Sequence, residues 1–258
     1  MDDGSLPPVT NLAVQSDGNL PVRIIRQDRK GAASARNSGS MQAQGKYLAF
    51  TDDDCCPHSN WLANLAKAFE NNPDSAVTGR TVNLLEGNAY ASAAQLLIDY
   101  LYAYYNALPQ RARFLTSNNF ALPSAAFHDL GGFRTEFSTA GGEDRELCDR
   151  WLGRGFSVIY ASEAVVFHSH SMTLTGFLKQ QFNYGKGAFH FNRLRSARNG
   201  SRLSIEPLEF YIRMFQFPLL KQKRFQAIMT AFLFAVSQGM NVAGFSLENA
   251  AYRLRLRS

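Results

Sequence analysis

The chain has 258 residues, of which 45% are hydrophobic, and its formal net charge is +6. This length can bury a sizeable core, and it fits one α/β domain with an appendage or two small domains. The three cysteines, Cys55, Cys56 and Cys148, match neither a disulfide framework nor a sulfur-liganded metal site, so they indicate a reducing compartment. The chain also starts without a basic stretch leading into an apolar run, which gives no sign of a secretory signal, and we expect a cytoplasmic protein.

The excess positive charge lies late in the chain, where from Lys186 onward many Lys and Arg residues face only Glu206, Glu209 and Glu248. Such a charge favours a phosphate-bearing ligand or an anionic membrane surface, although an ordinary solvated face has the same composition. A nucleic-acid binder is a further interpretation, but neither a recognised motif nor an interleaved aromatic platform supports it.

Hydrophobic periodicity and turn residues predict alternating strands and helices, which is typical of an α/β fold. After a turn at the start and a loop over Leu6–Leu20, the expected strands are Pro21–Gln27, Tyr47–Phe50, Ala76–Leu84, Phe114–Leu122, Val158–Tyr160 and Val165–His168. The expected helices are Gly31–Gln44, Asn60–Glu70, Ala89–Leu108, Pro123–Leu130 and one from Glu143 to about Arg154.

Three consecutive carboxylates, Asp52, Asp53 and Asp54, follow directly on the short apolar strand Tyr47–Phe50. Adjacent acids raise one another's pKa values, so the cluster is costly unless a metal ion or basic side chains offset its charge. Carboxylate oxygens suit Mg²⁺ or Mn²⁺. The acids also suit a turn and a cap for the next helix. Their place at a strand end favours ligand binding, because open α/β sheets bind ligands beyond the carboxyl ends of their strands.

A second acidic pair, Glu143 and Asp144, begins a helix directly after two glycines, and acids in a first turn also suit the helix dipole. Further along, His168 and His170 alternate, so both lie on one face if that segment stays extended. Either histidine is equally compatible with a hydrogen-bonded core position. Tyr100 and Tyr104, one helical turn apart, suit either stacking on a sugar or packing in a core.

Taken in order, these features resemble family 2 glycosyltransferases of the A-type fold over roughly residues 1 to 194. The segments that carry the resemblance are Asp2-Asp3-Gly4-Ser5, Ala35-Arg36-Asn37 with Gly39, Asp52-Asp53-Asp54, Gly131-Gly132-Phe133, Glu143-Asp144 and Tyr184-Gly185-Lys186-Gly187. The resemblance implies a Rossmann-like mixed sheet flanked by helices, with a catalytic domain over 1–205 and a helical basic tail over 206–258. The family pattern places a strand, a helix and a second strand before its Asp-Asp-Gly-Ser turn, so we expect an N-terminally incomplete nucleotide-binding sheet.

The resemblance also implies an activity, namely metal-dependent, inverting transfer of a sugar from a nucleotide-diphosphate sugar to an acceptor hydroxyl on a glycan or a lipid-linked molecule. The implied donor-binding residues are Asp2, Asp3, Arg36, Asp52 and Asp53. Because the expected sheet is incomplete, the alternative is a non-catalytic remnant that binds a sugar, a nucleotide or a partner.

Four further residues receive implied roles in the chemistry. Asp54 holds Mn²⁺ or Mg²⁺, which stabilises the departing diphosphate, and His168 completes the metal shell. Asp144, paired with Glu143, accepts the proton of the acceptor hydroxyl as general base. The neighbouring Arg145 is expected to favour the ionised form of that base.

The tail contains an uncharged run, Phe225 to Phe245, which approaches the length of a membrane span. Four polar residues fall on one helical face and predict a mildly amphipathic helix: Gln226, Thr230, Ser237 and Asn241. One interpretation is peripheral contact with the cytoplasmic face of the membrane, in which Lys221, Lys223, Arg224 and the Arg253–Arg257 cluster face anionic lipid. The other is an ordinary core helix with solvated basic flanks.

Overall fold

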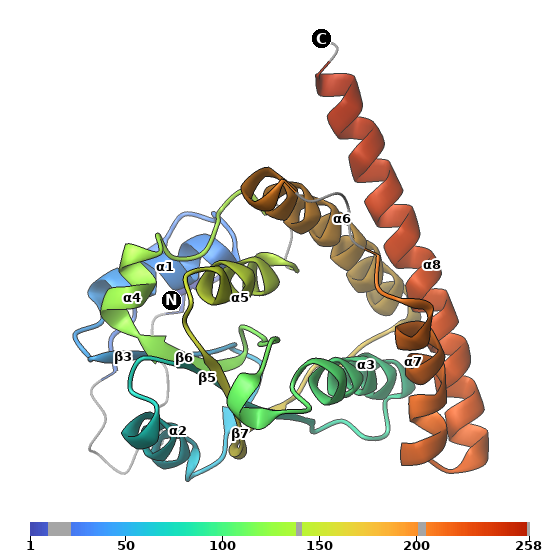
Figure 1. Cartoon of the computed structure of the whole chain (residues 1–258), viewed down its shortest axis with the longest axis horizontal. Helices are drawn as coiled ribbons and strands as arrows, with labels where there is room; N and C mark the ends of the chain where they lie inside the picture. The colour runs from blue at the N-terminus through green and yellow to red at the C-terminus, as the bar shows by residue number, and fades with distance from the viewer. Residues whose placement is uncertain (10–21, 138–140, 201–204, 257–258) are drawn as a thin grey trace.

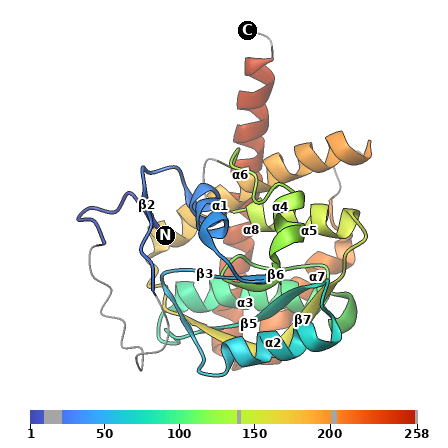
Figure 2. The ribbon, with the colours of Figure 1, turned by 90° about the vertical axis from the view of Figure 1, so that its left-hand side faces the viewer.

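The computed structural model describes residues 1–9, 22–137, 141–200 and 205–256. Its centre is a five-stranded mixed sheet in the order β3-β6-β5-β7-β4, flanked by helices (Figures 1 and 2). The strands are β3 (Tyr47–Thr51), β4 (Cys55–Pro57), β5 (Ala76–Asn83), β6 (Asn119–Pro123) and β7 (Val158–His168). This architecture confirms the expected α/β class with a mixed sheet and a C-terminal helical part.

Strand β5 pairs in parallel with β7 and antiparallel with β6, which in turn pairs antiparallel with β3. The register of β5 and β7 shifts between Gly79 and Arg80, so residues 162–164 bulge out of the ladder. The buried Asn119 side chain holds this bulge, because its amide donates to the carbonyls of Arg80 and Ala164, at 2.9 Å each.

Helices cover both faces of the sheet because alternate strand residues point to opposite sides. One face packs against α1 (Ala32–Gln42), α4 (Ser124–Asp129) and α5 (Glu143–Gly153), and its core includes Phe120 and Trp151. The other face packs against α2 (Trp61–Asn71) through a core that includes Leu65 and Val77.

Four helices form a second body beside the sheet: α3 (Ala89–Tyr105), α6 (Leu174–Asn199), α7 (Leu208–Lys221) and α8 (Arg224–Arg255). The last two share buried clusters with α3 and α6, since Leu233 packs with Phe177, and Phe234 packs with Tyr100 and Met214. The tail after residue 205 is therefore packed on the preceding helices, and α8 lines one edge of the molecule (Figure 1).

The helices predicted from periodicity, α1 to α5, lie where they were expected, within a few residues at each end. Tyr100 is 3% exposed and packs between α3 and α7, which favours the core interpretation over sugar stacking. A short 3₁₀ helix at Pro109–Arg111 was not predicted.

Three strand predictions need correction. Val158–Tyr160 and Val165–His168 are one continuous strand, because the bulge lets β7 keep its pairing with β5 on both sides. The strand expected from Phe114 begins only at Asn119, since residues 114–116 have no strand pairing. In the described part of the expected strand Pro21–Gln27, only β2 (Arg26–Gln27) forms, and it pairs in parallel with β1 (Asp2–Asp3). Pro21 and most of the expected loop Leu6–Leu20 lie outside the described residues.

Candidate active site

The three consecutive acids lie in the turn between β3 and β4, where each side chain has a different environment. Asp52 is partly buried and accepts a hydrogen bond from Arg36 at 2.6 Å. Asp53 is exposed, and Asp54 faces two imidazoles. The turn therefore directs the charges of its first and third acids to separate partners, which reduces the repulsion between them.

Asp54 contacts both His168 and His170, the two histidines that the sequence predicted on one face. The Nε2 atom of His168 and the Nδ1 atom of His170 each lie 3.1 Å from Asp54 Oδ2. The hydrogen bond from His168 is the main cause that lowers the pKa of Asp54 to about 2, and the same bond raises the pKa of His168. The carboxylate is therefore ionised near neutral pH, as a metal ligand must be.

A possible metal-ligand group consists of Asp54, Cys55 and His168, whose ligand atoms all lie within 4.8 Å of one another. Cys55 stands opposite His168 in the β4–β7 pair. Burial, followed by the charges of Asp52 and Asp54, raises the pKa of the Cys55 thiol to about 12, so the thiol stays neutral. Carboxylate and imidazole groups are better ligands for Mn²⁺ than a neutral thiol is. Asp54 and His168 are therefore the residues of this group that fit the expected cation.

Arg36 links the acidic turn to the start of α5. Its guanidinium donates to Asp52 Oδ1 at 2.6 Å and to Glu143 Oε1 at 3.0 Å, across 107 residues of sequence in the second case. The Arg36 side chain is 14% exposed and lies over the Phe133 ring. Such a buried, two-sided pairing keeps the guanidinium charged, and the Asp52 charge is the main cause that raises its pKa.

Glu143 and Asp144 have different partners although they are adjacent. Glu143 is 4% exposed and uses its second oxygen to accept a hydrogen bond from the Gly141 N–H at 2.8 Å. Asp144 accepts backbone N–H bonds from Arg145 at 2.7 Å and from Ser117 at 3.4 Å. Desolvation, followed by the Glu143 charge, raises the pKa of Asp144 to about 7.

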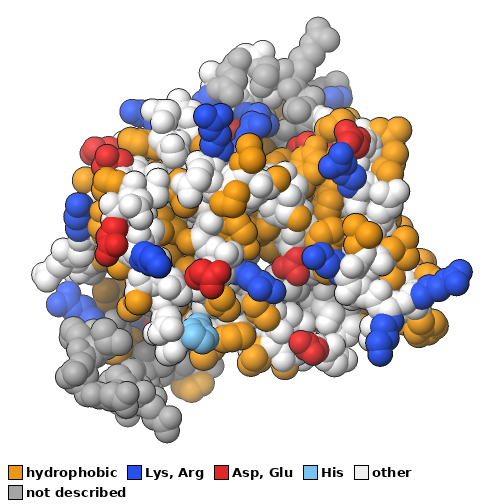
Figure 3. Space-filling view, turned by 60° about the horizontal axis from the view of Figure 1, so that its bottom comes forward, with side chains coloured by type: hydrophobic (Ala, Val, Ile, Leu, Met, Phe, Trp, Pro, Cys, Tyr) orange, Lys and Arg blue, Asp and Glu red, His pale blue; other side chains and the backbone are white. Residues whose placement is uncertain are grey.

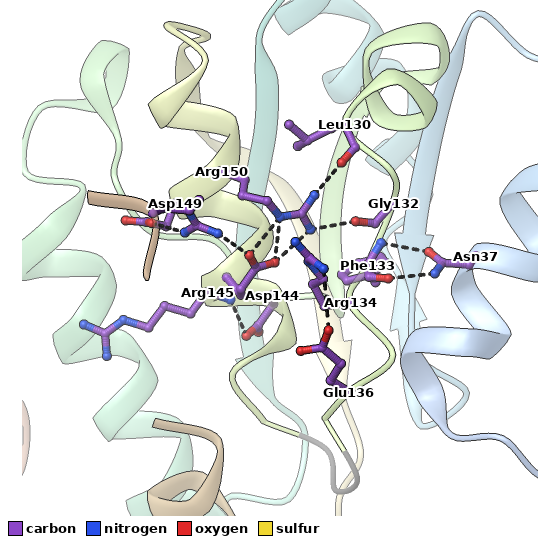
Figure 4. Close-up of polar contacts among 12 residues, drawn as sticks. Asn37, Leu130, Gly132, Phe133, Arg134, Glu136, Asp144, Arg145, Asp149 and Arg150 are labelled. Carbon is purple, nitrogen blue, oxygen red and sulfur yellow. Dashed lines mark hydrogen bonds and ion pairs between the residues drawn. The ribbon is translucent and has the colours of Figure 1, made fainter. Parts of the chain in front are cut away.

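Arg145 favours the ionised form of Asp144, as expected, but through its backbone N–H and not through its side chain. Its guanidinium extends away from the acid (Figure 4) to Glu206, at 3.6 Å, and lies over the Tyr105 and Phe191 rings. The cationic side chain that lowers the pKa of Asp144 belongs to Arg36. Sequence adjacency therefore identified the backbone contact of Arg145 and missed the charge of Arg36, while the Arg145 side chain points elsewhere because neighbouring helix residues point about 100° apart.

Two hydrogen-bonded units hold the loop that precedes α5 (Figure 4). The Asn37 side chain bonds both backbone groups of Phe133, at 2.8 Å each. Arg150 pairs with the buried Glu146 and donates to the carbonyls of Leu130 and Gly132, at 2.6 and 2.7 Å. The Gly131-Gly132 turn is thereby fixed to both α1 and α5.

The segment Tyr184-Gly185-Lys186-Gly187 lies inside α6 and contacts Gly141 and Gly142, the two residues before α5. A Cβ on Gly187 would lie 2.0 Å from the Gly141 carbonyl oxygen, and one on Gly141 would lie 2.5 Å from the Tyr184 ring. Gly141 and Gly142 both have positive φ and pack on α6 in this way. Lys186 pairs with Glu248 of α8 at 3.1 Å.

Asp2 and Asp3 lie in the small β1–β2 sheet, and hydrogen bonds within the N-terminal region occupy their oxygens. Asp2 accepts from the Ser5 N–H at 2.8 Å and pairs with Arg26. Asp3 accepts from the Gly31 N–H at 2.8 Å, just before α1 begins. The structure therefore brings Arg36, Asp52, Glu143 and Asp144 into one region, whereas the described hydrogen bonds of Asp2 and Asp3 stay within the N-terminal region. Their donor-binding role stays a prediction.

A comparison with known proteins identifies the family. A family model described as "Glycosyl transferase family 2" matches residues 1–131, half of the 258-residue chain. The chain belongs to glycosyltransferase family 2. The matched residues of this family 2 chain include the acidic turn and Arg36, whereas Glu143 and Asp144 lie beyond them.

Several curated relatives of this family 2 chain are named glycosyltransferases. Over 197 residues it is 29% identical to a pre-mycofactocin glycosyltransferase of Mycobacterium tuberculosis, covering 73% of this chain and 40% of the relative. It is 26% identical to the glycosyltransferase AglE of Haloferax volcanii, covering 72% of this chain and 60% of that relative. The chain thus spans roughly half the length of these relatives.

Among solved structures, the chain matches a mannosyltransferase from Pyrobaculum calidifontis in complex with GDP-Man and Mn²⁺, with a TM-score of 0.49 and 17% identity. That match covers 90% of this chain and 62% of the other.

Sequence reasoning missed two features of this family 2 site. The ion pair between Arg36 and Glu143 joins residues too far apart for any local pattern to reveal. His170 was noticed but not assigned, although it contacts Asp54 at the same distance as His168. The alternation of the two histidines was the signal that could have found it.

Proposed function

We propose that this chain carries the catalytic site of an inverting, metal-dependent glycosyltransferase, which moves a sugar from a nucleotide-diphosphate sugar to an acceptor hydroxyl. The observation that carries the proposal is the Arg36 bridge, which joins the acidic turn after β3 to the acidic start of α5. Arg36 thereby places Asp52, an acid assigned to the donor, in the same region as the acidic pair that includes the candidate base Asp144.

Asp144 is the residue assigned as general base. Its pKa of about 7 lies where a base works best near neutral pH, since it can be ionised and still accept a proton effectively. Glu143 is assigned a positioning role, because both of its oxygens already have partners in Arg36 and the Gly141 N–H.

Asp54 and His168 are assigned to the metal, which would act as a Lewis acid on the leaving diphosphate. Asp52, with Arg36 beside it, is assigned to the ribose side of the donor, and Asp53 to the same donor site. Mn²⁺ and Mg²⁺ both suit oxygen ligands, and the imidazole of His168 favours Mn²⁺. The acceptor class we propose is a glycan or a lipid-linked molecule.

Nucleotide-sugar binding and hydrolysis with Mn²⁺ test this function. We expect a screen of nucleotide sugars to yield one whose binding, measured by calorimetry, needs the cation and is abolished by a chelator. Asp54→Ala should weaken it severely, while Asp53→Ala, a change at the exposed neighbour, should leave metal dependence intact. Equal donor affinity in chelator and in Mn²⁺ would count against the metal assignment.

A second candidate function is a binding module without turnover, favoured by the bonds that occupy the oxygens of Asp2 and Asp3. The same assay separates the two functions. Metal-dependent donor binding without hydrolysis or transfer to any acceptor would support the binding module.

A further inference from the structure

Helix α8 exposes a set of large apolar side chains on the side that faces away from the protein. It lies at the right-hand edge of Figure 1, and α3, α6 and α7 all pack on its other side. Large hydrophobic residues along the outer face are between 47% and 75% exposed: Phe225, Ile228, Met229, Phe232, Val242 and Leu247. Hydrophobic side chains gather at the right-hand side of Figure 3, with Lys and Arg next to them.

The inner face of α8 buries apolar and polar residues together, and its apolar part includes Leu233, 8% exposed, and Phe234, 0% exposed. Ser237 is 0% exposed, Thr230 is 6% exposed, and Asn241 bonds the side chain of Gln181 in α6 at 3.3 Å. A surface helix in water normally presents polar side chains on the face opposite its buried apolar stripe, whereas the outer face of α8 is apolar as well. By length and composition α8 is also apolar enough to cross a membrane, and 28% of its most apolar window is buried in the protein.

The outer face lacks charge along most of its length and has cations at both ends. The described side chains facing outward from Phe225 to Ala250 are uncharged, and the one acid of α8, Glu248, pairs with Lys186 of α6. At the start of the helix, Lys221, Lys223 and Arg224 are exposed beside the apolar Leu219 and Leu220. Exposed Arg253 and Arg255 follow near its other end.

This charge pattern fits a lipid surface better than a second copy of the chain. Two copies joined antiparallel through this face would bring the cations at one end of α8 against the cations at the other end. Parallel copies would oppose like ends. Anionic lipid headgroups instead attract both basic ends, while the uncharged face contacts the acyl chains.

The packing of α8 on α6 argues against a spanning orientation. A Cβ on Gly185 of α6 would lie 2.0 Å from the Asn241 carbonyl oxygen, and one on Gly244 would lie 2.0 Å from that of Phe182. The two helices are therefore in direct backbone contact, and α6 would have to enter the hydrocarbon with Lys179, Arg193 and Arg195. Lying flat, α8 keeps both basic ends at headgroup level.

We propose that α8, together with the α7–α8 turn, lies in the interface of an anionic lipid bilayer with its outer face buried. The apolar face supplies the binding area and the basic ends select anionic headgroups. This proposal does not depend on transferase activity, and it can be tested on the whole chain.

Vesicle sedimentation of the full chain tests the proposal, using phosphatidylcholine alone and phosphatidylcholine mixed with phosphatidylglycerol. We expect binding to the anionic vesicles, weakened at least about tenfold by Phe232→Glu or Val242→Glu, which place a charge on the buried face. Lys221→Gln, Lys223→Gln and Arg224→Gln should each weaken binding to the anionic vesicles roughly fivefold.

The matched control is Leu62→Glu, which places the same charge at a 52% exposed leucine on α2, on the opposite side of the molecule from α8 (Figure 1). It should bind vesicles like wild type, and thermal unfolding should show that all variants fold. Equal binding of wild type and Phe232→Glu would overturn the proposal. A dimer that Phe232→Glu dissociates in sedimentation equilibrium, with no binding of the chain to vesicles, would also overturn it. Membrane association that survives alkaline extraction, as that of a spanning helix does, would overturn it too.

Discussion

Replacing Asp144 by asparagine removes the proposed base and leaves a side chain of the same size. The asparagine oxygen can still accept the Arg145 N–H bond that Asp144 accepts at 2.7 Å. Loss of a positioned base costs ~10²- to 10⁴-fold in rate, so transfer should fall by about that factor. Donor binding should survive, because the residues assigned to the metal, Asp54 and His168, lie outside α5.

The same substitution has an expected effect on stability that does not depend on activity. Asp144 titrates near 3.8 in an unfolded chain and at about 7 in the fold, so between these pH values the folded protein holds an extra proton. The free energy of unfolding therefore decreases as pH rises through that window. Asparagine does not titrate, so this decrease in the free energy of unfolding is absent in Asp144→Asn. The variant should therefore unfold at a higher temperature than wild type at about pH 8, and at nearly the same temperature at about pH 4.

Transfer rates and melting temperatures measured across this pH range check both effects. Glu143→Gln is the matched control, because it changes the adjacent carboxyl and keeps an oxygen for the Gly141 N–H. Near wild-type transfer in Asp144→Asn, with loss of transfer in Glu143→Gln, would refute the assignment of the base. A pH-independent difference in melting temperature would refute the raised pKa.

Glu143→Gln should shift the acidic limb of the pH–rate profile to lower pH, because it removes a negative charge that raises the pKa of the base. Arg36→Met should lower the free energy of unfolding by about 3–5 kcal/mol in urea denaturation, because it leaves a buried carboxylate unpaired, and the added Glu143→Gln change should restore part of the loss. Gly187→Ala should reduce transfer more than donor binding, because its Cβ would lie 2.0 Å from the Gly141 oxygen. Gly239→Ala, with nothing within 4 Å, should instead stabilise the helix by roughly 0.5–1 kcal/mol.

Local patterns in the sequence were sufficient to predict most of the helices and the acidic strand end. Helix α2 has its apolar residues Trp61, Leu65 and Phe69 at helical spacing and buries those three side chains. The strand β3 ends where its carboxylates begin. Such features depend on periodicity and on neighbouring residues, which a single sequence contains in full.

The sequence also determined the order of the family segments, and the family-model match over residues 1–131 bears out the resemblance. It placed Asp52, Asp54, Glu143 and Asp144 in two separate acidic segments. It did not determine which cation lies between those segments, because Arg36 and Arg145 are equally basic in sequence.

Only the tertiary structure decided the features that depend on contacts between distant residues. Arg36 joins Glu143, the bulge held by Asn119 makes β7 one strand, and α8 buries Thr230 and Ser237 in the protein. Of the four polar residues predicted on one face of α8, Thr230 and Ser237 are buried and Gln226 is exposed, and a sequence cannot state whether protein or water lies against each of them. The physical reason is that Gly185 and Gly244 permit a backbone contact between helices, and that contact selects the buried side.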